Sequence, residues 1–320
     1  MACLIRLPRP SVDKGETEFI DHLRRIATHP AARGLDDDTA VLPLGDDTLI
    51  ITHDMMVEGV HWLPDADPAD VAWKLVAVNL SDLAAKGVAP LGAVLGFTLA
   101  GDSDWDMRFA KGLEKALAQY AVPLLGGDTV SAPADKTMRA LGLTAFGRAT
   151  SDIVPSRAEA KAGDRLYVTG TVGDAYAGYL LAQKGDQGAA RLVNAFNRPV
   201  PLLAEGQALA GQVQAMMDVS DGLLLDASRM AQASGLRVTI DLETLPLSME
   251  YRANHGDDAE ALCAAASWGD DYQLLFALAK NATPAVPAHC VGHFLAGNGL
   301  DLRYRDAPYP LPERLGYLHR

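Results

Sequence analysis

Residues 68–87 read Pro-Ala-Asp-Val-Ala-Trp-Lys-Leu-Val-Ala-Val-Asn-Leu-Ser-Asp-Leu-Ala-Ala-Lys-Gly, an apolar stretch with proline at its start and glycine at its end. Proline is favoured in the first turn of a helix and glycine just beyond its last turn. The pattern therefore predicts a helix over residues 68–86. Lys74, Val78, Asp82 and Lys86 recur every fourth residue and share one stripe of that helix. The stripe is either a solvated face with a Lys86–Asp82 pair or one wall of a ligand site.

Short apolar runs on both sides of this helix are bounded by glycine and acidic turn signals, which is typical of strands. They cover residues 39–42, 49–52, 55–57, 92–99, 122–125 and 140–148. Amphipathic segments at residues 19–27 and 105–120 predict two more helices. Strands and helices mixed in this way indicate an α/β domain.

The same alternation returns after a polar stretch at residues 150–163, which we interpret as a linker. Strands are predicted at 165–169, near 216–217, at 237–242 and at 272–278, and helices from 174, over 223–234 and over 259–266. The tail contains three prolines within residues 308–312 and is expected to be extended. A chain of 320 residues suits two domains, predicted as residues 1–155 and 156–320.

The amino-acid composition and net charge of the chain argue against some classes of protein. Hydrophobic residues make up 49% and charged residues 22%, with a formal net charge of −13, as in a globular enzyme. That charge argues against nucleic acid or an anionic membrane as partner, and an anionic ligand would need cations to mediate its binding. Cys3, Cys263 and Cys290 fit reduced thiols, and we found neither a signal peptide nor an apolar run of membrane-spanning length. We expect a cytoplasmic protein.

Five aspartates stand where apolar segments end or inside an apolar helix: Asp54, Asp82, Asp128, Asp218 and Asp221. A carboxylate removed from water is costly unless a cation balances it, so these residues suggest bound divalent metal. Oxygen donors dominate the set, which favours Mg²⁺ over zinc or iron. Mg²⁺ held by several carboxylates is typical of phosphoryl transfer.

Each of these patterns also has a plainer interpretation. Gly126-Gly-Asp128-Thr129 follows a strand, and its two glycines would let a bulky ligand approach the backbone, but it could be a simple turn. In Asp218-Val-Ser-Asp-Gly222, Ser220 or Asp221 could be a helix N-cap, which would leave Asp218 without a role. The run at residues 36–38 could be a solvated acidic turn, and His53 and His61 could be ordinary surface or core histidines.

Nine segments carry a resemblance to a known family. They are Asp37-Asp-Thr-Ala40, residues 52–61 (Thr-His-Asp-Met-Met-Val-Glu-Gly-Val-His), residues 77–87 (Ala-Val-Asn-Leu-Ser-Asp-Leu-Ala-Ala-Lys-Gly), Leu125-Gly-Gly-Asp-Thr129, Gly147-Arg148, residues 167–174 (Tyr-Val-Thr-Gly-Thr-Val-Gly-Asp), Asp218-Val-Ser-Asp-Gly-Leu223, Gly269-Asp-Asp-Tyr-Gln-Leu-Leu275 and Gly316-Tyr317. In this order they resemble the thiamine-monophosphate kinase family of the aminoimidazole ribonucleotide synthetase-like superfamily. The resemblance covers nearly the whole chain.

The resemblance implies a two-domain α/β (α+β) fold. An N-terminal mixed sheet would form a barrel with its twin in a homodimer, beside a C-terminal α/β domain. It also implies phosphorylation of thiamine monophosphate to thiamine diphosphate, with ATP as co-substrate and several Mg²⁺ ions as cofactors.

Site residues are carried over position by position. The implied metal ligands are Asp38, Thr52, Asp54, Asp82, Asp128, Asp218, Asp221 and the backbone of His53. The implied nucleotide contacts are Gly127, Asp128, Arg148 and Ser220, and the implied contacts to thiamine monophosphate are His61, Asp270 and Tyr317. Asp128 and Asp218 are expected to be catalytic.

Some positions depart from the family pattern: Asp36 stands for a glycine and His53 for a threonine. Trp268-Gly-Asp-Asp-Tyr-Gln273 stands for Gly-Gly-Glu-Asp-Tyr-Glu, so Asp270 is one methylene shorter than the glutamate it replaces. Within the superfamily, the chain lacks the reactive cysteine of a selenophosphate synthetase and the terminal cysteine of a hydrogenase-maturation protein. A synthetase of the same superfamily and a non-catalytic Mg²⁺-nucleotide binding module remain alternatives.

Overall fold

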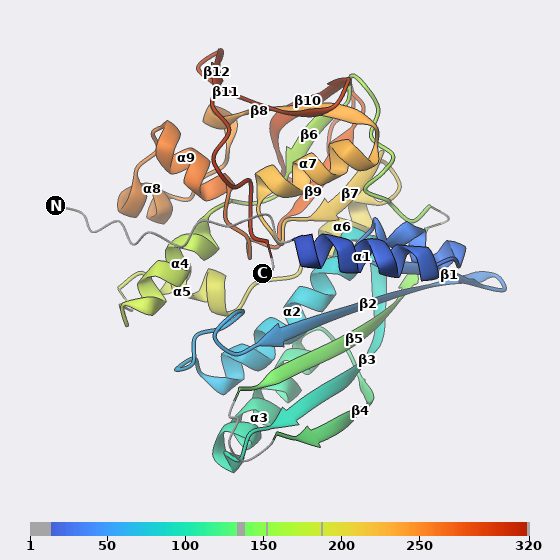
Figure 1. The fold of residues 1–320 in the computed structure, drawn as a ribbon, viewed down its shortest axis with the longest axis vertical. Helices are drawn as coiled ribbons and strands as arrows, with labels where there is room; N and C mark the ends of the chain where they lie inside the picture. The colour runs from blue at the N-terminus through green and yellow to red at the C-terminus, as the bar shows by residue number, and fades with distance from the viewer. Residues whose placement is uncertain (1–13, 133–137, 152, 187, 319–320) are drawn as a thin grey trace.

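The strands of the protein form two separate mixed sheets. The computed structural model describes residues 14–132, 138–151, 153–186 and 188–318, with side chains from residue 18 onward, so Cys3 lies outside it. Within these residues one sheet has five strands and the other seven. Figure 1 shows the first sheet in the lower half of the molecule and the second in the upper half. The predicted two-domain α/β fold is therefore confirmed.

The first sheet has the strand order β1-β2-β5-β3-β4 and is antiparallel except for the pair β3 and β4. Its strands are β1 (Ala40–Leu44), β2 (Asp47–Val57), β3 (Val88–Leu99), β4 (Leu124–Ser131) and β5 (Ala140–Ala149). The two expected strands at 49–52 and 55–57 are one continuous strand, because His53 and Asp54 pair in register with β5. Their polar side chains gave the appearance of a break.

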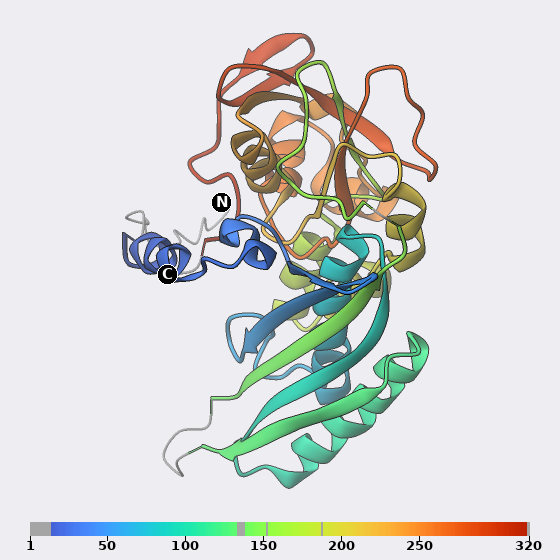
Figure 2. The same cartoon turned by 90° about the vertical axis from the view of Figure 1, so that its right-hand side faces the viewer.

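Helices α2 (Pro68–Ala85) and α3 (Ser103–Gln119) cover one face of this sheet, as Figure 2 shows for α3. Side chains of a strand alternate between faces, and in β5 Leu141, Leu143 and Ala145 are buried against these helices. Thr144 and Phe146 lie on the opposite face and are only partly buried. We call this second face the open face.

Helix α2 connects the two halves. The side chain of Asp67 caps its N-terminus by accepting a hydrogen bond from the Ala69 amide at 2.8 Å, and Pro68 occupies the first turn. Gly87 ends the helix with φ +62°, and a Cβ there would lie 2.3 Å from that of Ala210, so both conformation and packing require glycine. The helix packs on β2, β3 and β5 of the first half and on α5 (Ala190–Asn197), α6 (Leu203–Leu209) and β7 (Ala215–Asp218) of the second.

The interpretation of the Lys74–Lys86 stripe as a solvated face is wrong. Lys74 and Lys86 are both buried, and Lys86 pairs with Asp37 and Asp38 rather than with Asp82. The physical reason is that the stripe faces residues distant in sequence, including those of the second domain, which helical periodicity alone does not indicate.

The second sheet has the order β12-β11-β8-β10-β6-β9-β7 and contains one parallel pair, β8 with β11. Its strands are β6 (Arg165–Val168), β7 (Ala215–Asp218), β8 (Leu236–Asp241), β9 (Leu274–Leu278), β10 (His289–Ala296), β11 (Gly299–Tyr304) and β12 (Ala307–Tyr309). The helices of this half are α4 (Asp174–Gln183), α5 (Ala190–Asn197), α6 (Leu203–Leu209), α7 (Leu223–Ala233), α8 (Met249–His255) and α9 (Ala259–Ala266).

Sequence patterns missed several of these elements. Strands β10 and β11 were not predicted, and part of the expected extended tail is strand β12, where Pro308 lies at the sheet edge and its missing N–H is tolerated. Helices α5, α6 and α8 have at most eight residues, too few for a clear period. At the N-terminus, α1 (Lys14–Ile26) and the 3₁₀ segment Pro30–Leu35 lead into β1. None of the described helices combines the length and apolar character needed to cross a bilayer.

Candidate functional site

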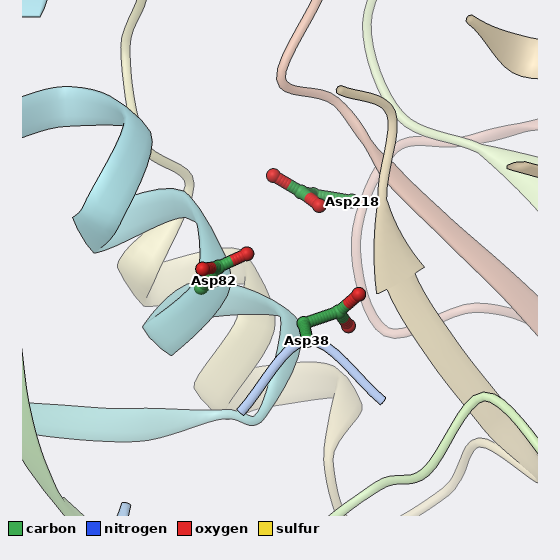
Figure 3. A group of neighbouring side chains, drawn as sticks. All are labelled: Asp38, Asp82 and Asp218. Atoms are coloured by element: carbon green, nitrogen blue, oxygen red, sulfur yellow. The ribbon is translucent and has the colours of Figure 1, made fainter. Parts of the chain in front are cut away.

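Three of the expected metal ligands meet between the two domains. Asp38 precedes β1, Asp82 lies on α2 and Asp218 is the last residue of β7. One carboxylate oxygen from each lies within 4.8 Å of the others. Figure 3 shows the three side chains arranged around one space, each from a different element. We call Asp38, Asp82 and Asp218 the acidic triad.

Hydroxyl groups orient two members of the triad. The Thr52 hydroxyl donates a hydrogen bond to Asp82, and Ser81 Oγ donates to Asp218 Oδ2 at 2.6 Å across the domain boundary. Strand alternation places Asp54 on the same helix-covered face as Thr52, and the Asp54 amide donates to Asn79 Oδ1 at 3.0 Å. Thr52 and Asp54 therefore lie on the side of the sheet that holds the triad.

The charges of the triad oppose one another. Burial raises the pKa of Asp82 well above its ordinary value, and the nearby carboxylates of Asp54, Asp218 and Asp38 raise it further. Burial likewise raises the pKa of Asp218, with Asp38 the strongest neighbouring charge. Like charges held this closely away from water favour a bound cation or bound protons.

Asp38 differs from the other two because basic side chains surround it. Lys86 Nζ lies 2.7 Å from Asp38 Oδ2 and 2.5 Å from Asp37 Oδ1, and the Arg157 guanidinium pairs with Asp38 Oδ1. Burial alone would raise the pKa of Asp38, but Arg157 and Lys86 outweigh it and lower the pKa to about 2. Asp38 is therefore held ionised. Neither base was among the predicted site residues, because the contacts join positions 49 and 119 residues apart.

The loop between β7 and α7 is held by an aspartate that sequence reasoning also missed. The buried Asp226 accepts hydrogen bonds at Oδ2 from the backbone amides of Asp221 (3.1 Å) and Gly222 (3.2 Å). Arg229 bridges Asp226 and Asp221, at 3.0 and 2.5 Å. Burial, followed by the charge of Asp221, raises the pKa of Asp226 to about 7. The N-cap of α7 is Gly222, so the N-cap interpretation of Ser220 or Asp221 is wrong.

The donor set fits Mg²⁺. The triad, with Thr52 and Asp54 beside it, offers hard oxygen ligands, and hard oxygen is what Mg²⁺ prefers. Asp38 Oδ2 is buried and pairs with the Lys86 ammonium at 2.7 Å. Three buried carboxylates this close together, two of them with raised pKa values, form a site whose repulsion a divalent cation would relieve.

A second group of expected site residues lies elsewhere, on the open face. His53 pairs in register with Thr144, and its Nδ1 lies 2.9 Å from Thr144 Oγ1, so its side chain points away from the triad. Asp128 and Arg148 occupy open-face positions on β4 and β5, and Gly127 precedes Asp128. Strands β2 and β4 are separated by β5 and β3, three steps of about 4.8 Å or about 14 Å in all. Within one chain, Asp128 is therefore too far from Asp54 to share an ion with it.

Two of the expected substrate residues, Asp270 and Tyr317, contact the loop of residues 218–222. The Asp270 amide donates to the Ser220 carbonyl at 2.8 Å, and the Tyr317 amide donates to the Asp221 carbonyl at 2.8 Å. Lys74 Nζ contacts both the His61 carbonyl (3.0 Å) and Asp270 Oδ2 (2.9 Å). The structure thus connects His61 and Asp270 through a lysine that sequence reasoning placed on the helix but not in the site.

Two family models match the chain. Residues 36–149 match the N-terminal domain of AIR synthase related proteins, and residues 161–293 match the C-terminal domain of the same proteins. The first matched segment contains all five strands of the first sheet, and the second contains strands β6 to β9 and part of β10.

Individual proteins are also similar to this chain over most of its length. The thiamine-monophosphate kinase of Caulobacter vibrioides is 39% identical over 326 residues, covering 95% of this chain and 91% of its own. The solved complex of AaThiL with AMPPCP and TMP is 27% identical with a TM-score of 0.84, covering 98% of this chain and 100% of that one. The thiamine-monophosphate kinase structure from Stenotrophomonas maltophilia is 31% identical with a TM-score of 0.74, covering 91% and 96%.

Proposed function

The chain belongs to the thiamine-monophosphate kinases of the AIR synthase related family, and from this premise we propose that it transfers the terminal phosphoryl group of ATP to thiamine monophosphate, forming thiamine diphosphate. The observation that supports this most directly is the acidic triad between the domains, beside the loop that carries Ser220 and Asp221. A relative of the same fold binds the ATP analogue AMPPCP together with thiamine monophosphate.

We propose that Asp38, Thr52, Asp54, Asp82, Asp218 and Asp221 hold the metal. Mg²⁺ bound there would neutralise phosphate charge during the transfer. The chain's own contribution is to position these ligands: Thr52 and Ser81 orient two carboxylates, and Lys86 and Arg157 keep Asp38 ionised. The attacking phosphate oxygen is already largely deprotonated at neutral pH, so no general base is required.

We further propose that the open face is a homodimer interface that closes the two sheets into a barrel. Met55 and Leu125 expose 55% and 60% of their surface, and a Cβ on Gly92 would lie 2.6 Å from the Leu125 side chain, so Leu125 covers that face. Val130 on edge strand β4 is also exposed. Apolar groups grouped along an uncovered sheet and its edge favour association with another copy. In this arrangement residues 1–155 form the dimerisation domain and residues 156–320 the second domain.

The same dimer explains the separation of Asp128 from the triad. His53, Asp128 and Arg148 lie on the face that the second copy would cover, whereas the triad lies on the other side of the sheet. We propose that Gly127, Asp128 and Arg148 contact the nucleotide bound mainly by the partner copy. Each active site would then draw ligands from two chains.

Phosphorus NMR of the protein with MgATP and thiamine monophosphate tests the proposed reaction. Signals of ADP and thiamine diphosphate should appear together and in equal amounts. Asp128→Asn should lower turnover by orders of magnitude without unfolding the protein, while Asp104→Asn on the exposed surface of α3 should leave it unchanged. ATP binding without either product would instead indicate a nucleotide-binding module.

A further inference from the structure

Lys74 is a buried lysine that joins three separate segments. It lies on α2 with 3% of its surface exposed. Its Nζ donates to the His61 carbonyl at 3.0 Å and to Asp270 Oδ2 at 2.9 Å, and lies 3.9 Å from the ring centroid of Phe196 on α5. Its ammonium is thus placed between a loop of the first domain and two segments of the second.

Asp270 is held in one orientation by its neighbours. Tyr272 Oη donates to Asp270 Oδ1 at 3.0 Å while Lys74 binds Oδ2, so both carboxylate oxygens have protein partners. Asp270 and Tyr272 adopt left-handed backbone conformations, with φ +68° and +48°. Such conformations are strained for residues other than glycine and persist only where surrounding contacts impose them.

Those contacts come from the loop that ends β7. The amides of Asp270 and Tyr272 donate to the carbonyls of Ser220 and Val219, both at 2.8 Å. A Cβ on Gly269 would lie 2.1 Å from the Ser220 carbonyl oxygen, so only glycine allows this approach. The Asp270 side chain is 26% exposed, which leaves it accessible to a ligand.

We propose that Lys74 is a positioning residue for thiamine monophosphate. By binding the His61 carbonyl and the Asp270 carboxylate at the same time, it sets the spacing between the two segments, one from each domain, that are expected to contact this substrate. The inference rests on the proposed function. Lys74 is expected to influence the binding of thiamine monophosphate and not the binding of ATP.

Lys74 is expected to affect the binding of thiamine monophosphate alone because of its position along α2. Asp82 lies eight residues beyond Lys74, about 12 Å along the helix axis. The contacts that orient the triad come from Thr52, Ser81, Lys86 and Arg157, and Lys74 is bonded to none of them in the described chain. Removing the Lys74 ammonium should therefore disturb the substrate segments and leave the metal ligands in place.

Lys74→Met tests the inference because methionine keeps most of the side-chain length but removes the charge, its hydrogen-bond donors and the cation–π contact with Phe196. We expect the KM for thiamine monophosphate to rise about ten-fold or more, as for the loss of one charge-assisted hydrogen bond, with the KM for ATP within about two-fold of the wild type. Calorimetric titration of thiamine monophosphate into the protein saturated with AMPPCP should show the same loss of affinity. Lys111→Met on the exposed surface of α3 is the matched control.

Two further variants separate positioning from a general structural role. Lys74→Arg, which keeps the charge, should recover part of the affinity. In the pair Lys74→Met and Asp270→Asn, the double variant should lose less affinity than the product of the single losses, because Lys74 acts largely through Asp270. If Lys74→Met folds poorly, Lys74→Gln, shorter and uncharged, should show the same split between the two substrates.

The outcomes distinguish this inference from the proposed reaction. Equal losses for ATP and thiamine monophosphate, or an unchanged affinity for thiamine monophosphate in Lys74→Met, would overturn the role of Lys74 while wild-type turnover still stands. A wild type that binds thiamine monophosphate without turnover removes the proposed reaction but leaves the titration as a test of Lys74. A wild type that does not bind thiamine monophosphate overturns both.

Discussion

Asp82 on α2 and Asp218 at the end of β7 approach each other from different domains, with carboxylate oxygens within 4.8 Å. Each has a pKa raised by burial and by neighbouring carboxylates, and each accepts a hydrogen bond from a hydroxyl group of the first domain. The domains therefore meet at a point of mutual repulsion, which a divalent cation would relieve.

Asp82→Asn should stabilise the metal-free protein while abolishing turnover. The amide has no charge to repel Asp218, and its carbonyl oxygen can still accept from Thr52, so we expect a gain of about 1 kcal/mol in the free energy of unfolding without metal. Thermal unfolding with and without Mg²⁺ measures this gain, with Asp104→Asn as the control. Lower stability of the metal-free variant would show that repulsion between the carboxylates of Asp82 and Asp218 does not destabilise the fold.

Stabilisation by Mg²⁺ should increase with pH. The pKa values of Asp82 and Asp218 are raised above 3.8, so above pH 3.8 the folded metal-free protein retains protons that the unfolded chain has released. Their contribution to stability is present at the low end of this range and is lost as the pH rises through the raised values. Mg²⁺ displaces these protons, so its shift of the melting temperature should be larger at about pH 8 than at about pH 4.5, just above the ordinary pKa. Equal shifts at both pH values would contradict this account.

Lys86→Met should destabilise the fold. The ammonium of Lys86 is fully buried between Asp37 and Asp38, and its removal leaves two buried carboxylates with Arg33 and Arg157 as their remaining basic partners in the described chain. We expect a loss of about 3 kcal/mol in the free energy of unfolding, as for other broken buried ion pairs. Urea denaturation measures it, and Lys161→Met, at an exposed position, should change stability by less than about 0.5 kcal/mol.

Mixing two inactive variants should restore activity if each site uses two chains. Asp82→Asn damages the triad of its own chain, whereas Asp128→Asn damages the contribution to the partner's site. A heterodimer of the two then has one intact site, so an equal mixture after subunit exchange should recover roughly a quarter of the wild-type turnover. A mixture as inactive as its components would place Asp128 and Asp82 in the same chain's site.

Leu125→Asp should separate the proposed dimer. A buried aspartate without a partner is costly at an apolar interface, so we expect a monomer of unchanged secondary structure in sedimentation or size-exclusion measurements. Met107→Asp, on the exposed surface of α3, alters a comparably exposed apolar residue away from the open face and should leave the assembly unchanged. A wild-type protein that sediments as a monomer would overturn the interface itself.

The sequence predicted those parts of the fold that local patterns encode. Helix α2 was predicted over 68–86 and observed over Pro68–Ala85, because proline, glycine and an apolar period mark it within one segment. Strand β10 was missed because its burial depends on neighbours β6 and β8, which are distant in sequence. The short helix α8 was missed because two turns give no clear period.

The residues of the candidate site also fall into two groups, those that the sequence indicated and those that only the structure revealed. Asp82 and Asp218 could be singled out because a carboxylate inside or at the end of an apolar segment is unusual in itself, whereas Asp38 was indicated by the family resemblance. The cations Lys86, Arg157 and Lys74 carried no such signal, since a lysine on a helix or an arginine in a linker is ordinary until its partner is known.

By itself, the sequence determined the residue types and the local elements of this protein: oxygen ligands that suit Mg²⁺, two α/β halves and the segments shared with thiamine-monophosphate kinases. Only the tertiary structure decided which charges meet. It brings Asp38, Asp82 and Asp218 together, buries Lys86 and Lys74 against their carboxylates, and puts Asp128 on the other face of the sheet. The physical reason is that electrostatic energy depends on distance and burial, and both are set by contacts between residues far apart along the chain.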